Sequence, residues 1–556
     1  MAGKDLDVAA LIRKYAIKNA IDYGKADVGS VLGKVIPQAK GTPVPELKKE
    51  VEAVVKEVNK MKKAELEKAY EPFEEEFEER AKAVAEKTAR PNLEIEGAVK
   101  GEVITRISPG PNGYMHIGHV KQALLSSEVA NLYDGKLYRY FDDTNPEACK
   151  QEYVDAMMRD HEWLGLKFAK TYYASDFVDT IYKYAKILME KGKGYVCTCD
   201  RDKMQKERFA GEECEHRKQT VEENEKLFKR MLDGEYDEGE AVLRYKGDMK
   251  AHNTILRDPV MLRIVEAPHY RVGTKYRVWP VYDFNTPIVD SLQGITDIIR
   301  SKEYELHDEL GEQILKALGL RVPRMHLEAR LNIRGNITQK RDIRELIETG
   351  KISGWDDPRL MTIMALRRRG ITPEAIRNFV MHLGMTKTDS TVPFDMLLAE
   401  NRRIIDTYAK HLFFVPDPVE VTAHGAENPV RLKLHPSMDI WYREYKVGDK
   451  FYVPKEDSGF KLVLKDSGAS VPGTKGAKEK IVQWVADRNY IKCSVLVPGD
   501  LVDKYGKFNP DSLNVVEGYV ESYAEKLKEH EIVQFERFGY CILDDKKKMQ
   551  FIFISK

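Results

Sequence analysis

The chain has 556 residues, of which 42% are hydrophobic and 32% charged, so several domains with their own cores are expected. Lys plus Arg and Asp plus Glu both number 90, which excludes a uniformly basic nucleic-acid binder and confines any phosphate-binding surface to a local patch. Long apolar runs and an unbroken apolar N-terminal core are both missing, and six cysteines are few, so we expect no membrane span, secretory signal or disulfide scaffold, and a cytoplasmic location.

Residues 1–95 form the first expected domain, and their pattern is helical. Apolar residues recur at helical spacing between Asp7 and Ala20, and a highly charged stretch follows from Pro45 to Lys87. Like and unlike charges alternate along that stretch, which is typical of a solvated helix with ion pairs four residues apart. Residues 92–101 are the expected linker.

A strand, a turn and a helix follow the linker. Residues 103–108 are short and β-branched, residues 109–113 are rich in Gly and Pro, and residues 116–133 have helical apolar spacing. This order places His116 and His119 at a helix N-terminus, where backbone N–H groups and the helix dipole attract phosphate.

Gly118 lies between these two histidines and leaves the first helical turn without a side chain, so that a flat ring can approach the backbone. Metal ligation and an ordinary surface position are the alternatives for His116 and His119. No carboxylate or cysteine lies at matching helical spacing, which weakens the metal alternative.

Strands and helices continue to alternate. A second strand, residues 136–141, ends in Asp142 and Asp143, and helices are expected over residues 152–164 and 177–191. This alternation predicts a doubly wound, Rossmann-like parallel sheet with ligands at the carboxyl ends of its strands. We assign residues 96–194 and 276–335 to its two halves, with the sheet resuming at Tyr276–Ile288, and residues 195–275 to an inserted subdomain.

Cys197, Cys199, Cys214 and His216 of the insert form the pattern C-x-C-x14-C-x-H. Two close pairs of soft ligands suit tetrahedral zinc, although the pairs are closer than in the commoner C-x2-C pattern. Buried cysteines without a metal are the alternative. Since no open position or general base is evident, the zinc would be structural.

Residues 336–412 comprise a basic turn and a helical connector, in which Pro373 is a plausible helix start. Lys340 and Arg341 in the turn suit the charge that develops on phosphates, and a basic surface turn is the alternative. From residue 413 to 556, short alternating runs separated by Gly, Pro, Asp and Lys predict all-β modules. The fold class is therefore multidomain, α/β plus all-β.

The run R-I-S-P-G-P-N-G-Y-M-H-I-G-H, residues 106–119, resembles the ATP-binding signature of class I aminoacyl-tRNA synthetases in the glutamyl/glutaminyl branch. Residues 336–341 resemble the second signature loop more loosely, because Gln339 stands where a serine usually precedes the key lysine. The C-terminal β region resembles anticodon-binding β-barrels. The resemblance to the glutamyl-tRNA synthetases covers about residues 100–556, and the N-terminal helical unit and the barrel-type C-terminus resemble the archaeal form.

This resemblance implies a glutamate–tRNA ligase that forms glutamyl-adenylate from glutamate and ATP with Mg2+, and then transfers the glutamyl group to the 3′ end of tRNA. His116, His119, Lys340 and Arg341 would be the catalytic residues, and Gly118 would join His116, His119 and Lys340 in binding ATP. The implied partners are ATP, L-glutamate and glutamate tRNA; charging of glutamine tRNA and the oligomeric state stay open, with a monomer favoured. For the charged N-terminal stretch, a tRNA-binding or dimerising arm is the alternative to a solvated helix.

The amino-acid pocket is argued from charge. Glutamate needs cations for two carboxylates, for which Arg106 and Arg300 are placed, and an acid for its ammonium, for which Asp142 is placed. Tyr282 supplies an amphipathic wall, and Ser108 completes the expected substrate-binding set. Each of these residues could instead be a structural pair or a core residue.

Arg300 decides between the two amino acids of this branch. By resemblance, glutamyl enzymes carry arginine at this position and glutaminyl enzymes a smaller uncharged residue. An unpaired arginine would penalise an amide and reward a carboxylate, which favours glutamate. A glutaminyl ligase and a catalytically silent tRNA-binding paralogue are the alternatives, and Gln339 is the only support for the silent paralogue.

Overall fold

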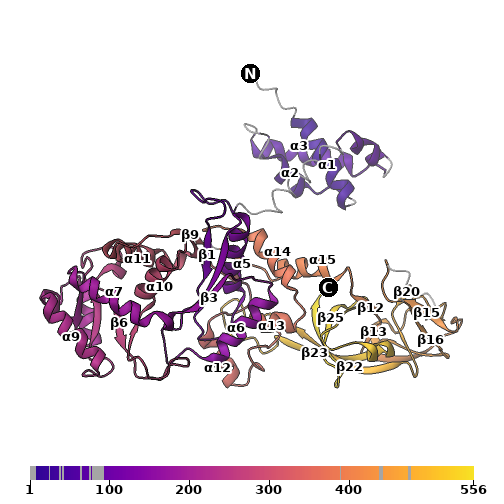
Figure 1. Ribbon diagram of the computed structural model, residues 1–556. Helices are drawn as coiled ribbons and strands as arrows, with labels where there is room; N and C mark the ends of the chain where they lie inside the picture. The colour runs from indigo at the N-terminus through magenta and orange to yellow at the C-terminus, as the bar shows by residue number, and fades with distance from the viewer. Residues whose placement is uncertain are drawn as a thin grey trace. The chain divides into compact units, whose positions relative to one another are not determined.

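The computed structural model describes residues 8–23, 25–36, 39, 43–62, 65–73, 77, 93–388, 390–437, 442–473 and 478–556 (Figure 1). The chain divides into two compact units, residues 1–91 and 92–556. None of the helices among the described residues is long and apolar enough to cross a membrane.

The first unit is helical, as its pattern predicts. Its helices α1 (Val8–Tyr23), α2 (Val28–Val35) and α3 (Val44–Val58) bury a small core of aliphatic side chains. Asp27 begins α2 by accepting a hydrogen bond from the Ser30 N–H at 2.8 Å, which pairs one of the free donors of the first turn. The charged stretch is helical over α3 and residues 65–73, and residues 78–92 lie outside the described part.

The second unit contains the predicted parallel sheet, and its five strands are parallel throughout. In spatial order they are β3 (Lys170–Tyr173), β2 (Lys136–Phe141), β1 (Ile104–Ile107), β8 (Asp297–Ser301) and β9 (Arg324–Glu328). Strand order reverses between β1 and β8, and such a reversal opens a crevice at the carboxyl ends of the strands.

Helices connect consecutive strands of this sheet. They are α5 (Ile117–Leu132) after β1, α6 (Gln151–Trp163) after β2, α7 (Val178–Glu190) after β3, and α10 (Tyr282–Leu292) and α11 (Glu305–Leu318) on either side of β8. The apolar side chains of α5 pack with those of β1 and β2 in one large core, so the N-terminus of α5 is held at the crevice.

The insert carries an antiparallel sheet of its own. Its strands are β4 (Gly194–Cys197), β5 (Val242–Tyr245), β6 (Val260–Ile264) and β7 (Val278–Pro280), accompanied by α8 (Arg201–Ala210) and α9 (Val221–Asp233). The expectation that the parallel sheet resumes over Tyr276–Ile288 is wrong, because β7 closes the insert's sheet and α10 follows it. A short apolar run does not distinguish a strand from a buried helix, which explains the error.

The connector is helical in α12 (Lys340–Glu348), α13 (Ile363–Arg368), α14 (Pro373–Leu383) and α15 (Asp395–Ile405). Pro373 is the first residue of α14, as predicted, and Thr372 caps that helix. Two short strands, β10 (Leu331–Ile333) and β11 (Ser390–Val392), pair in parallel within this region and were not predicted.

The C-terminal region is β-rich, as predicted. Its main sheet has the order β12 (Lys410–Leu412), β24 (Ile532–Phe535), β25 (Gly539–Asp545), β26 (Gln550–Ser555), β22 (Tyr490–Pro498), β23 (Leu513–Glu521) and β13 (Phe414–Pro416). The two edge strands, β12 and β13, are separated by only one residue in the chain, so the sheet curls back on itself. Residues 418–486 form three smaller sheets around a second core.

Candidate active site

A pocket of about 450 Å³ lies at the carboxyl ends of β1 and β8. Seven of the residues predicted from sequence line it: Ser108, His116, Gly118, His119, Asp142, Tyr282 and Lys340. They come from segments more than 200 residues apart, which the parallel sheet brings to one edge.

The two histidines begin α5 and have defined proton positions. His116 Nδ1 accepts a hydrogen bond from the Gly118 N–H at 3.1 Å, and His119 Nδ1 accepts one from the His116 N–H at 3.2 Å. A neutral imidazole carries one N–H, so in each ring this hydrogen is assigned to Nε2. Burial, reinforced by nearby cations, lowers the pKa of His116 to about 4 and that of His119 well below its ordinary value. Both rings are therefore neutral hydrogen-bond donors near pH 7.

Gly118 makes this arrangement possible. A Cβ at Gly118 would lie 2.9 Å from His116 Cε1, closer than real Cβ contacts allow. The flat ring for which Gly118 leaves room is thus the His116 imidazole, whose centroid lies 3.8 Å from that of His119.

Lys340 reaches the same pocket from the start of α12. Its Nζ donates a hydrogen bond to Asn112 Oδ1 in the turn before α5. A Cβ at Gly113 would lie 2.7 Å from Lys340 Cδ, so the lysine crosses directly over that turn. Arg341 is exposed and does not line the pocket, whereas Arg330, which was not predicted, does.

The helix that carries Lys340 is supported by the C-terminal β region. Ile343 and Leu346 of α12 share a small core with Leu501 and Val502, which lie between β22 and β23. The Val502 N–H also donates to the Gly335 carbonyl at 3.2 Å. The position of the lysine therefore depends on a segment about 160 residues further along the chain.

Asp142 provides the acidic side of the pocket. It follows β2 and is half-buried, and its Oδ1 accepts a hydrogen bond from Thr144 Oγ1 at 2.8 Å. Burial is the main cause that raises the pKa of Asp142 to about 6.

Arg106 is 1% exposed and does not line the pocket. Its Nε lies 3.1 Å from both carboxylate oxygens of Asp290 on α10, and its Nη2 lies 2.8 Å from Asp290 Oδ2. This bidentate geometry matches the structural ion pair that was the alternative for Arg106.

Arg300, at the end of β8, is also buried and is not itself among the pocket-lining residues, but it lies behind two of them and is only partly paired. Its Nη1 donates to Asp308 Oδ1 at 2.6 Å, while Nε and Nη2 have no hydrogen-bond partner among the described residues. The guanidinium carbon lies 4.5 Å from the Tyr304 ring centroid and 5.5 Å from that of Tyr282, and both tyrosines line the pocket. Two buried donors without partners are costly, so this side chain suits an anionic acceptor.

A buried ion pair that sequence reasoning missed supports the opposite wall. Lys121 Nζ lies 3.0 Å from Glu328 Oε2 and donates to the Ala329 carbonyl at 2.7 Å. The signal for it was a lysine between the apolar positions Val120 and Leu124 of α5, on the buried side of that helix. This pair joins α5 to the end of β9.

The insert contains the predicted cysteine–histidine cluster. The ligand atoms of Cys197, Cys199, Cys214 and His216 all lie within 4.8 Å of one another. Cys214 Sγ is 3.7 Å from Cys197 Sγ, 3.4 Å from Cys199 Sγ and 3.2 Å from His216 Nδ1. Tetrahedral zinc with bonds of about 2.3 Å to sulfur places ligand atoms roughly 3.5–3.8 Å apart, so the four residues fit this metal.

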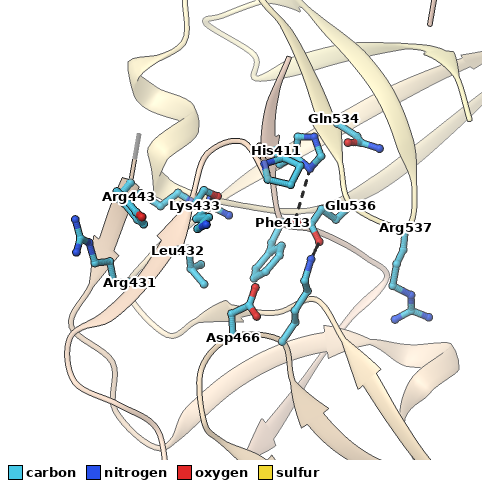
Figure 2. A pocket seen from close by; sticks show the side chains of 13 residues that line it. His411, Phe413, Arg431, Leu432, Lys433, Arg443, Asp466, Gln534, Glu536 and Arg537 are labelled. Atoms are coloured by element: carbon cyan, nitrogen blue, oxygen red, sulfur yellow. Dashed lines mark hydrogen bonds and ion pairs between the residues drawn. The ribbon is translucent and has the colours of Figure 1, made fainter. Parts of the chain in front are cut away.

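A second pocket, of about 620 Å³, lies in the C-terminal β region between β12, β24 and the hairpin of β15 (Val430–Lys433) and β16 (Tyr442–Tyr445) (Figure 2). Basic side chains dominate its lining: His411, Arg431, Lys433, Arg443, Lys465 and Arg537. His411 Nε2 and Gln534 Oε1 are buried there without a hydrogen-bond partner among the described residues. Asp466 and Glu536 also line this pocket, and Glu536 pairs with Lys465, but basic side chains are in excess. An excess of basic side chains around unpaired hydrogen-bonding atoms suits a polar, anionic ligand.

Residues 102–406 match the family described as tRNA synthetases class I (E and Q), catalytic domain, and residues 481–544 match the anti-codon binding domain of the same class. The chain is 38% identical to a glutamate–tRNA ligase of Nitrosopumilus maritimus (strain SCM1) over 98% of this chain and 99% of that relative. It is 39% identical to one of Cenarchaeum symbiosum (strain A), over 96% and 97% of the two chains. It is 38% identical to one of Pyrococcus furiosus, over 97% and 98%.

Proposed function

Since this chain belongs to the class I tRNA synthetases for glutamate and glutamine, we propose that it is a glutamate–tRNA ligase. An oxygen of the α-carboxylate of glutamate attacks the α-phosphorus of ATP, and pyrophosphate leaves. The ribose hydroxyl at the 3′ end of tRNA then attacks the carbonyl carbon of glutamyl-adenylate, and AMP leaves. Neither step needs a nucleophilic side chain, so catalysis consists of positioning and charge stabilisation.

His116 and His119 act on the phosphates. Their Nε2–H groups donate hydrogen bonds without first losing a proton, and the α5 N-terminus adds its partial positive charge. Lys340, which crosses the turn before α5 and lines the same pocket, stabilises the charge that develops on the leaving pyrophosphate. Mg2+ would be held chiefly by phosphate oxygens and water and would neutralise part of their charge.

Asp142 and Arg300 act on glutamate. Asp142 binds the α-ammonium, and the unpaired Nε–H and Nη2–H of Arg300 bind the side-chain carboxylate behind the wall of Tyr282 and Tyr304. This half-paired arginine is the observation that carries the choice of glutamate. Glutamine would offer its amide N–H2 to one of the same donors and leave it unpaired.

The cysteine–histidine cluster is proposed to hold one structural zinc ion, which would join β4 to the segment that follows α8. The His216 Nε2 lies 3.0 Å from Thr198 Oγ1, and such an outer hydrogen bond orients a ligand ring. Arg244 Nη1 lies 3.8 Å from Cys197 Sγ and would offset thiolate charge.

The pocket of Figure 2 is proposed to receive a base and its phosphate from the tRNA anticodon. The family match of residues 481–544 supports this role, and these residues contain Gln534 and Arg537. Unpaired His411 Nε2 and Gln534 Oε1 could read the edge of a splayed base, and the surrounding cations could bind its backbone.

The decisive test is aminoacylation of glutamate and glutamine tRNAs, with each amino acid, by the wild-type chain and by Lys340→Ala. We expect charging with glutamate, and a fall of two or more orders of magnitude in the adenylation rate of the variant with tRNA affinity nearly unchanged. Lys351→Ala, on the same connector but outside the pocket, is the control and should retain activity. Charging with glutamine alone, or no charging by the wild type, would refute the proposal.

A further inference from the structure

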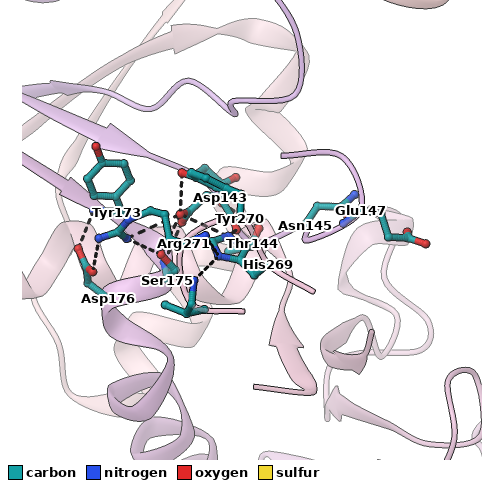
Figure 3. A network of polar contacts seen from close by, with 12 residues as sticks. Asp143, Thr144, Asn145, Glu147, Tyr173, Ser175, Asp176, His269, Tyr270 and Arg271 are labelled. Atoms are coloured by element: carbon teal, nitrogen blue, oxygen red, sulfur yellow. Dashed lines mark hydrogen bonds and ion pairs between the residues drawn. The ribbon is translucent and has the colours of Figure 1, made fainter. Parts of the chain in front are cut away.

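Two successive carboxylates follow β2, and only the first lines the pocket. Asp142 faces the substrate site, whereas Asp143 is 0% exposed and is not among the pocket-lining residues. Figure 3 shows Asp143 at the centre of a polar network that joins three segments of the second unit. The loop that carries the proposed ammonium ligand is therefore held from behind by its neighbour.

The Asp143 carboxylate receives three hydrogen bonds. Oδ1 accepts from the Ser175 N–H at 2.8 Å, and Oδ2 accepts from Ser175 Oγ at 2.8 Å and from the Tyr270 hydroxyl at 3.1 Å. Ser175 lies in the short helix after β3, and Tyr270 lies in a hairpin of the insert between β6 and β7. All three groups can donate to Asp143, and the two hydroxyls could accept in turn, but only an ionised carboxylate accepts from all three at once.

His269 of that hairpin binds the Asp143 backbone. Its Nδ1 accepts from the Arg271 N–H at 3.2 Å, so its hydrogen is assigned to Nε2, which donates to the Asp143 carbonyl at 2.9 Å. The ring stacks on Trp279 with centroids 4.8 Å apart. The hairpin thus binds the side chain of Asp143 through Tyr270 and its backbone carbonyl through His269.

Arg271 forms the outer layer of the network. It donates to Ser175 Oγ at 2.6 Å and to Asp176 Oδ1 at 3.0 Å, and its guanidinium carbon lies 3.8 Å from the Tyr173 ring centroid. Asp176 lies at the exposed rim, with 43% of its side chain accessible. The network is therefore buried at Asp143 and reaches solvent at Asp176.

We propose that Asp143 is a positioning residue for the reaction, because it clamps the loop that carries Asp142 to Ser175 and to the insert's hairpin. The inference rests on the proposed role of Asp142 in binding the substrate ammonium. Asp142 Oδ1 accepts from Thr144 Oγ1, and the Asp142 N–H donates to the Pro109 carbonyl. Neither of these hydrogen bonds attaches Asp142 to the insert. The described hydrogen bonds of His116, His119 and Lys340 do not involve the network, so the ATP side should be insensitive to Asp143.

The test is steady-state tRNA charging by the full chain carrying Asp143→Asn, with glutamate and ATP varied separately. The amide would turn an N–H2 toward donors, so the KM for glutamate should rise tenfold or more while the KM for ATP changes less than twofold. A fall in kcat with an unchanged glutamate KM, or equal changes in both KM values, would overturn the proposal.

Two further variants keep the test decisive if Asp143→Asn does not fold. Tyr270→Phe removes one donor to the same carboxylate and keeps the ring, and it should raise the glutamate KM two- to fivefold. Asp155→Asn makes the same chemical change at an exposed position of α6 outside the network and should leave both KM values unaltered. Equal effects of the Tyr270 and Asp155 variants, or none from Tyr270→Phe, would show that Asp143 only supports the fold. Failure of the wild type to charge glutamate would instead refute the proposed function.

Discussion

At the scale of the residue, the number of hydrogen-bonding atoms that are already paired separates structural side chains from those available to substrate. Arg106 and Arg300 are both buried near the carboxyl ends of central strands, yet only Arg300 keeps two N–H groups free among the described residues. His116 and His119 use Nδ1 within the helix turn and keep Nε2 for a ligand. The pocket is thus a set of donors held in place before phosphate or carboxylate arrives.

Arg300→Ala tests the choice of amino acid. Losing a partly desolvated pair with the substrate carboxylate should cost roughly 2–5 kcal/mol in kcat/KM for glutamate. Glutamine should lose much less, because its amide makes no comparable pair. The measurement is tRNA charging with each amino acid, and Arg300→Lys is the control that keeps the charge without the forked geometry. Equal losses for both amino acids would mean that Arg300 binds the shared α-carboxylate.

The pH dependence of glutamate binding tests Asp142. Its pKa is raised to about 6, and only the ionised carboxylate pairs with an ammonium. Lowering the pH below about 6 should therefore raise the KM for glutamate, approaching tenfold per pH unit, while the KM for ATP stays flat because the pKa of His116 is about 4. Asp142→Asn should show a high KM without this dependence. A flat glutamate KM in the wild type between pH 7 and 5 would remove Asp142 from the site.

At the scale of the element, short segments far apart in the chain hold the catalytic groups. The insert begins with β4, whose last residue, Cys197, belongs to the proposed zinc cluster, and ends with β7 directly before α10 and Tyr282. Disorder in the insert would therefore be transmitted to one wall of the amino-acid pocket.

Metal analysis of the purified chain, prepared without chelator, should find about one zinc per chain, and Cys214→Ser should lower this content sharply. The variant should loosen the insert, as measured by faster proteolysis between residues 198 and 220. Cys493→Ser is the matched control, since Cys493 is also buried but lies in the C-terminal sheet, and it should leave the zinc content unchanged. A metal-free wild type would exclude the zinc site.

At the scale of the whole molecule, equal numbers of acidic and basic residues coexist with local basic sites. The pocket at the carboxyl ends of β1 and β8 and the C-terminal pocket of Figure 2 are separate cavities of the second unit. Basic side chains gather at the C-terminal pocket. Such separation lets one nucleic acid be held at two places while the overall charge stays neutral.

Gln534→Leu tests the C-terminal pocket. It removes the buried, unpaired amide oxygen at similar size, and losing one or two hydrogen bonds of about 1–1.5 kcal/mol each should lower kcat/KM for tRNA about fivefold or more. Arg488→Gln, with a side chain 92% exposed and outside the pocket, is the control. Unchanged tRNA kinetics in Gln534→Leu would assign this pocket to another ligand.

The sequence by itself determined the parallel sheet, the helix start at His116, the cysteine–histidine pattern and the β-rich C-terminal region. Each of these depends on local information: periodicity, turn residues, or the spacing of ligands within about 20 residues. The seven predicted residues that line the pocket also needed the resemblance to a known family, because local pattern alone would make the turn of Lys340 an ordinary basic surface turn. Parallel strands then collect the loops of these residues at one edge.

Only the tertiary structure decided which of the two buried arginines, Arg106 or Arg300, keeps N–H groups without a partner among the described residues, and where α10 begins. The partner of Arg106 is 184 positions away, whereas that of Arg300 is 8 positions away, and no local pattern distinguishes the two. The support of Lys340 by residues 501–502 and the network around Asp143 likewise arise from contacts between distant segments. Burial and pairing are properties of the packed molecule, and therefore a residue's type and neighbours in sequence do not determine whether its hydrogen-bonding atoms remain available.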